Sequence, residues 1–146
     1  MTENVIISIR GEQIFDGQEP DVTELVTAGT LEHDPVEGYC LAYQETELTG
    51  MEGTRTEFRV KDRQITLTRS GGVNSVMVFE EGARHLSMYE TPFGALSVGV
   101  NTRRMRADLN SAGGEIEIDY ALEINHSISG LNQFHIQVKK TPKLKQ

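Results

Sequence analysis

Apolar and polar residues alternate along nearly the whole chain, which is the pattern of a strand with one buried and one solvated face. The clearest stretch begins at residue 116, where Ile116, Ile118 and Tyr120 alternate with Glu117 and Asp119. The same period of two recurs in about ten segments. They include residues 5–9, 39–43, 56–60, 65–67, 86–88 and 134–138. No segment has a convincing helical period, so the pattern predicts an all-β protein.

The connections between these segments are short. Asp62-Arg63 leaves barely two residues between neighbouring strands, and Gly71-Gly72 favours a tight hairpin. Short links join antiparallel neighbours, so the sequence predicts a meander. A meander of this size hides its edges by closing on itself, whereas a β-sandwich needs longer crossing connections. We therefore expect a single closed antiparallel meander β-barrel of about 8–10 strands.

No Pro/Ser-rich linker and no low-complexity stretch divides the 146 residues. We therefore expect one domain over residues 1–146, with a barrel core at about 4–140. No run approaches the roughly 18 apolar residues that a membrane-spanning helix needs. The single cysteine, Cys40, cannot form an internal disulfide, and the first ten residues lack a signal-peptide pattern. These features predict a cytoplasmic protein with no membrane partner.

Charge is unevenly distributed along the chain. The formal net charge is −8, but four lysines lie in a basic tail at 139–146, so the preceding residues carry −12. Such a surface repels phosphate backbones, and we expect no nucleic-acid partner. The tail itself is either a solvated end or a contact for an acidic partner.

Three motifs carry a resemblance to a known family. They are GYCLAYQETELTGMEGTRT at 38–56, YETPFG at 89–94 followed by Thr102, and IDYAL at 118–122. Together they resemble the YwiB-like family of uncharacterised bacterial proteins, over about residues 4–140. The resemblance implies a calycin-like barrel of lipocalin shape, and it brings no established activity, ligand or catalytic residue. Unlike secreted lipocalins, the chain has no Trp and no disulfide pair.

Alternate residues of a strand point to the same face, so several apolar faces of the predicted strands end in charged residues. Glu45 and Glu47 continue the face of Tyr43, and Arg69 continues the face that begins at residue 65. If these strand ends gather at a barrel mouth, they form an apolar floor with a charged rim. An arginine there suits a small anion or an amphipathic acid.

A second set of candidates lies further along the chain. Arg104 and Arg106 share the apolar face of residues 96–100, provided that no bulge changes the register. Tyr120 adds an aromatic ring that can stack on a ligand or pack in the core. The candidate ligand contacts are therefore Tyr43, Glu45, Glu47, Arg69, Arg104, Arg106 and Tyr120. The alternatives are a network of ion pairs inside the barrel and strand ends that emerge into water.

Catalytic patterns are scarce. The histidines His33, His85, His126 and His135 show no metal-ligand spacing, and the lone Cys40 rules out a zinc–cysteine cluster. Adjacent acids such as Glu80-Glu81 point apart on a strand, so nothing supports an acid–base pair. We expect no metal, no cofactor and no catalytic residue, and a binding protein rather than an enzyme.

Two functions from different classes follow. The first is a barrel that binds a small molecule, with the arginines as anion contacts. The alternative is a protein-interaction or structural module that acts through its outer surface as a homo-oligomer, such as a homodimer. Its candidate surface is the segment Val73–Phe79, which is apolar on both faces.

Overall fold

The computed structural model contains ten strands and describes residues 2–14, 19–46, 50–72, 74–91, 93–125 and 127–141. The strands are β1 (Thr2–Ile14), β2 (Asp21–Asp34), β3 (Gly38–Gln44), β4 (Thr54–Lys61), β5 (Gln64–Gly71), β6 (Ser75–Glu80), β7 (Arg84–Thr91), β8 (Gly94–Asn110), β9 (Gly113–Ile124) and β10 (Ser127–Lys140). The described residues contain no helix able to cross a membrane. The all-β prediction is confirmed, and most of the basic tail lies outside the described residues.

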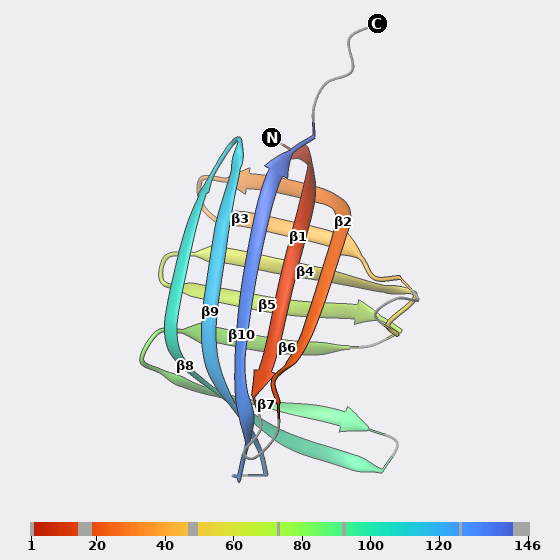
Figure 1. Ribbon diagram of the computed structural model, residues 1–146, viewed down its shortest axis with the longest axis vertical. Coiled ribbons are helices and arrows are strands. Elements are labelled where there is room, and N and C mark those ends of the chain that lie inside the picture. Colours follow the sequence, from red (N-terminus) through yellow and green to blue (C-terminus); the bar gives the residue numbers. More distant parts are fainter. Residues whose placement is uncertain are drawn as a thin grey trace, which may run out of the picture.

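All ten strands belong to one antiparallel sheet with the order β6-β5-β4-β3-β2-β1-β10-β9-β8-β7. Strands that follow one another in sequence are neighbours on both sides of the β1–β10 pair, so the sheet is a meander whose two ends are joined by that pair. Figure 1 shows the result as two layers that cross steeply: β8, β9, β10 and β1 form one, and β3 to β6 form the other. β2 belongs to both layers, because it curves from the first into the second.

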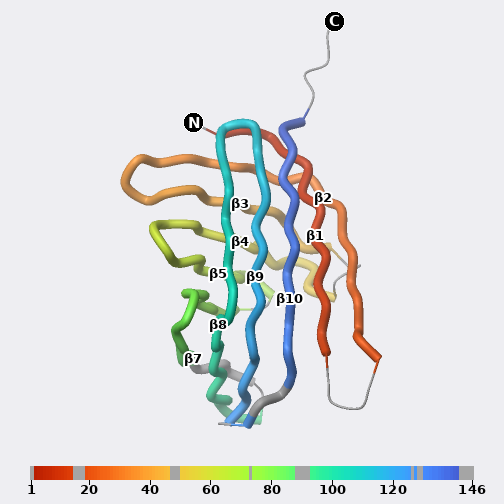
Figure 2. The backbone as a smooth tube through the Cα atoms, turned by 60° about the vertical axis from the view of Figure 1, so that its left-hand side comes forward, coloured from red at the N-terminus to blue at the C-terminus, as the bar shows by residue number. Residues whose placement is uncertain are grey.

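The barrel is nearly closed rather than fully closed. Consecutive strands β6 and β7 do not pair in the described sheet, although every other consecutive pair does. Their connecting turn bonds instead to β8: the Gly82 N–H donates to the Thr102 carbonyl at 2.9 Å, and the Thr102 N–H donates to the Ala83 carbonyl at 3.1 Å. In Figure 2 this turn and the β2–β3 and β4–β5 turns lie on the side of the molecule where β8 runs.

The core lies between the two layers. Alternate residues of every central strand point into it, as the period-two pattern requires. The largest fully buried side chains are Phe58 and Phe79, together with Ile7, Leu41, Ile65, Leu67, Ile116, Ile118 and Ile136. Burial of these apolar faces is the main favourable contribution to folding.

Gly29 marks the point where β2 turns from one layer to the other. Before it, β2 pairs with β1 alone, and from Thr30 onward it also pairs with β3. A Cβ at Gly29 would overlap the carbonyl oxygen of Ala42 and Cδ1 of Ile7. The backbone oxygen has no freedom to move aside, so the crossing of the layers requires a residue without a side chain here.

We expect Gly29→Ala to lower the free energy of unfolding by about 1–3 kcal/mol, because it overpacks this corner. Gly11→Ala is the matched control, since a Cβ there would lie 3.6 Å from the Phe134 ring, an ordinary contact. Urea titration of both variants measures the difference. Equal stability of the two would contradict the close approach inferred at Gly29.

Candidate functional site

A row of polar side chains crosses the inner face of β3, β4 and β5. Tyr43 lies opposite Thr56, and Thr56 lies opposite Arg69. All three point inward because the next row toward the middle of the barrel, Leu41, Phe58 and Leu67, is buried core. The row therefore replaces an apolar layer of the interior with hydroxyl and guanidinium groups.

Glu45 follows β3 and joins this row from one side. Its N–H donates to the Thr54 carbonyl at 2.8 Å, which extends the pairing beyond the end of β3. Its side chain is only 5% exposed, and its carboxylate accepts a hydrogen bond from Thr56 Oγ1 at 2.5 Å. The Tyr43 hydroxyl is hydrogen-bonded to the same carboxylate. Such bonds offset the cost of burying an acid away from water.

Arg69 is the cation of the cluster. Its charge acts on the hydroxyls of both Tyr43 and Tyr120, so the guanidinium faces the interior between the two layers. The Nε atom is shielded from solvent and has no hydrogen-bond partner among the described residues. Buried donors in native proteins nearly always have a partner, so this N–H is a marked exception.

The opposite layer contributes a second polar row. Tyr120 of β9 lies between Thr102 of β8 and Asn132 of β10, and all three are buried. The Tyr120 ring packs edge-on against Phe79, with ring centres 4.9 Å apart. Thr102 Oγ1 is buried and, like Arg69 Nε, has no hydrogen-bond partner among the described residues.

Both inner tyrosines are held in their protonated form. Burial raises the pKa of Tyr43, and the negative charge of Glu45 raises it further. Burial also raises the pKa of Tyr120 to about 12, while the Arg69 charge acts in the opposite direction. Each ring therefore keeps its hydroxyl proton at neutral pH and can donate it to an acceptor.

The structure brings together four of the seven residues proposed from the sequence as ligand contacts: Tyr43, Glu45, Arg69 and Tyr120. Glu47 lies outside the described residues. Arg104 and Arg106 lie elsewhere, because β8 has a bulge between Thr102 and Arg104. The expected inward face holds as far as Thr102 and is then reversed, so both arginines project outward opposite Asp119 and Glu117.

Two features were missed by the sequence reasoning. One is a cleft of about 390 Å³ between the β4–β5 turn, the β6–β7 turn and β8. It is lined by Val60, Ile65, Met105 and Ala107, with Asp62, Arg63, Gln64, Glu80 and Glu81 also around it. The other is an outer-face group formed by Glu115, Glu117 and His135. Each combines residues from different strands, so no spacing along one segment could reveal it.

We expect Thr56→Val to lower the free energy of unfolding by about 1–3 kcal/mol, because it removes a donor from the buried Glu45 carboxylate. Thr68→Val is the control: it has the same shape change on the same sheet, but Thr68 faces outward opposite Glu57. Urea unfolding at pH 7 compares the two. A loss no larger in Thr56→Val would show that the Glu45 contact contributes nothing to stability.

The raised pKa of Tyr120 predicts a loss of stability in alkali. Below about pH 10 the phenol is protonated in both states, and its full contribution is present. Between pH 10 and 12 the unfolded chain ionises first and is favoured. Between pH 8 and pH 11 the free energy of unfolding should fall by about 1 kcal/mol more in the unsubstituted protein than in Tyr120→Phe. Urea titrations at both pH values test this, and parallel losses would contradict it.

Comparison with known proteins identifies relatives of this fold. The family described as a domain of unknown function (DUF1934) matches residues 7–136. The uncharacterised β-barrel protein YwiB of Bacillus subtilis is 26% identical over 123 residues, which is 84% of each chain. The crystal structure of ywiB protein from the same organism has a TM-score of 0.78 at 20% identity, covering 97% of this chain and 94% of that one. These matches confirm the resemblance that the motifs indicated, and the chain belongs to the DUF1934 family of β-barrel proteins.

Proposed function

We propose that this protein binds a small organic anion inside its barrel and acts as a calycin-like binding protein of the cytoplasm rather than as an enzyme. The observation that carries the proposal is the buried Nε–H of Arg69, which has no partner among the described residues. A guanidinium is suited to a carboxylate, because its N–H groups form a planar fork that matches two oxygens. A free, buried Cys40 is consistent with a reducing compartment.

The surroundings of Arg69 favour an acid with an apolar body. The Phe79 ring, on β6 next to the strand of Arg69, packs against the Tyr120 ring of the opposite layer, and Phe134 lies 5.8 Å from Tyr120 in that layer. The Tyr120 hydroxyl and Thr102 Oγ1 add neutral hydrogen-bonding groups. The Glu45 carboxylate accepts bonds from Thr56 and Tyr43 at the other end of the same polar row.

The seam between β6 and β7 supports a way in. Arg69 lies opposite Ser75, the first residue of β6, and β6 is one end of the sheet order. Strands at an unpaired edge open locally at lower cost than strands paired on both sides. A ligand entering beside β6 would therefore reach Arg69 on the next strand, opposite Ser75.

Native mass spectrometry of protein purified gently from its expressing cells tests the proposal. We expect a bound acid that is lost on denaturation and is absent from Arg69→Gln, because that variant lacks the guanidinium. Arg104→Gln is the matched control, since it removes an arginine from the outer face. The same adduct on both variants would contradict a role for Arg69.

A thermal-shift assay covers a ligand lost during purification. Sodium decanoate provides a carboxylate with an apolar body, and inorganic phosphate provides an anion without one. We expect decanoate alone to raise the melting temperature, in the native protein and in Arg104→Gln but not in Arg69→Gln. Stabilisation by neither anion, together with no adduct, would overturn the proposal.

The cleft of about 390 Å³ beside β8 gives a further control. Its charged residues are mostly acidic, with Arg63 against Asp62, Glu80 and Glu81, so it suits an anion less well. If Arg63→Gln abolished binding and Arg69→Gln did not, the ligand would belong in that cleft.

A second candidate function is protein interaction through the edge of the sheet. Val76 on β6 is 48% exposed and Leu86 on β7 is 55% exposed, on two strands that each have an unpaired edge in the described sheet. Within Val73–Phe79, Phe79 is buried and Val73 lies outside the described residues. A dimer mass in the native spectrum that disappears in Val76→Lys would favour this alternative.

A further inference from the structure

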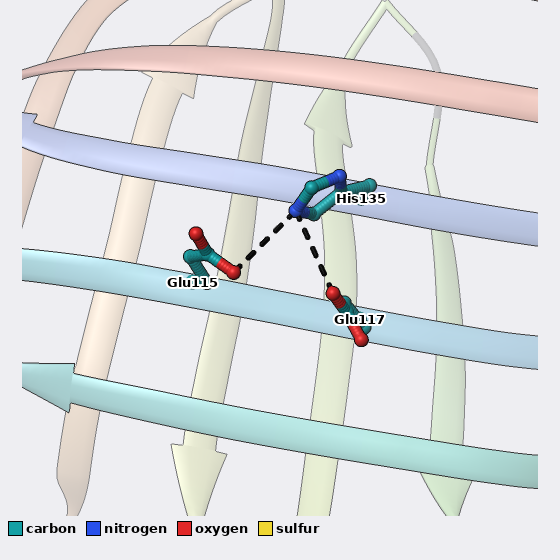
Figure 3. A group of neighbouring side chains, drawn as sticks. All are labelled: Glu115, Glu117 and His135. Carbon is teal, nitrogen blue, oxygen red and sulfur yellow. Dashed lines mark ion pairs between the residues drawn. The ribbon is translucent and has the colours of Figure 1, made fainter.

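The outer face of the long-strand layer carries a group that is separate from the Arg69 site. Glu117 of β9 lies directly opposite His135 of β10, and Glu115 is two residues away on the same face of β9. Figure 3 shows the His135 ring directed toward the space between the two carboxylates. β9 and β10 are paired on both sides, so their backbones hold these side chains on a rigid surface.

The distances in this group match those of a small metal centre. His135 Nε2 lies 3.6 Å from Glu115 Oε2 and 3.7 Å from Glu117 Oε1. One donor atom from each residue lies within 4.8 Å of both others. Zinc bonds to nitrogen and oxygen are about 2.0–2.2 Å, which places the ligand atoms of a tetrahedron about 3.3–3.6 Å apart. A slight closure of the group would therefore satisfy that geometry.

The ring nitrogen that faces the carboxylates is unusual. The His135 side chain is 42% exposed, yet its Nε2 atom is shielded from solvent and has no hydrogen-bond partner among the described residues. The two carboxylate oxygens are too far away for a hydrogen bond. The ring nitrogen is turned away from water, toward two anionic oxygens that lie within ion-pair distance but beyond hydrogen-bond distance, and a metal ligand would be placed in the same way.

We propose that Glu115, Glu117 and His135 bind a divalent cation of the zinc type, with solvent as the fourth ligand. One imidazole nitrogen and two carboxylates are a donor set that zinc accepts, whereas magnesium and calcium prefer oxygen alone. Asp108 lies opposite Glu115, and Asp119 lies two residues beyond Glu117. These acids leave an excess of negative charge that a dication offsets.

Arg106 competes for the same position. Its terminal nitrogen lies 3.2 Å from Glu115 Oε2 and 3.3 Å from Glu117 Oε1, the two oxygens that face His135. The Arg106 side chain is 58% exposed, so it can swing into solvent at little cost when a metal enters. Competition of this kind makes a specific prediction, because removal of Arg106 should strengthen metal binding.

Calorimetric titration of the chelator-treated, full-length protein with Zn²⁺ tests the site. We expect one zinc per chain, and an affinity at least about tenfold lower in His135→Gln and Glu117→Gln. His85→Gln is the matched control: His85 Nε2 also faces a carboxylate, 3.0 Å from Glu80 Oε1, but outside this group. Urea unfolding of each variant confirms that the fold is retained.

The arginine comparison separates this site from general attraction to an acidic surface. Arg106→Gln should tighten zinc binding about two- to fivefold, whereas Arg104→Gln, one row away on the same face, should change it much less. Cobalt should give the intense visible absorption of a tetrahedral site, lost in His135→Gln. Zinc affinity unchanged in His135→Gln, or raised equally by the two arginine variants, would overturn the proposal.

Discussion

Ten residue pairs between β1 and β10, from Val5 with Lys140 to Ile14 with Leu131, join the two ends of the meander. The other strand pairs form between neighbours in sequence, so each closes a short loop at modest entropic cost. The β1–β10 ladder alone brings together strands from opposite ends of the chain. Without it the described sheet would be two separate meanders, β1–β6 and β7–β10, with no enclosed interior. We expect this closure to be the slow event in folding.

Closure also decides what the two faces of the sheet can do. Inside, the polar rows on β3–β5 and β8–β10 face one another only because the layers cross, which places Tyr120 within the electrostatic reach of Arg69. Outside, β9 and β10 are central strands, and their charged side chains form rows whose spacing is fixed by the ladder. The sheet therefore has two chemically different faces. Its inner face is buried, and a cation such as Arg69 is an exception there. Its outer face is exposed to solvent and carries many charged side chains.

The sequence was sufficient for the features that depend on local pattern. The alternation of Ile116, Ile118 and Tyr120 with acids marked β9, and the tight turns at Asp62-Arg63 and Gly71-Gly72 indicated antiparallel neighbours. The same counting placed Tyr43 and Arg69 on apolar strand faces, and it left open whether these strand ends lie inside the barrel or emerge into water. Closing the meander implied that the first strand meets the last. The register between strands was not readable, so neither the residue pairs of β1 with β10 nor the meeting of Glu117 with His135 could be predicted from a single segment.

The bulge in β8 limited the prediction most, because one extra residue is invisible in the pattern yet reverses all that follows. Because of the bulge, Met105 points inward and Arg106 points outward. The backbone of Thr102, beside the bulge, forms hydrogen bonds with Gly82 and Ala83 of the β6–β7 turn. Arg103 is the extra residue, so deletion of its codon would leave Arg104 and Arg106 outward and Met105 inward, as they are with the bulge. Deletion of a codon from the regular part of the strand, such as that of Val100, would instead exchange the two faces on one side of the deletion. Loss of a residue should therefore be tolerated at the bulge and disruptive elsewhere in β8.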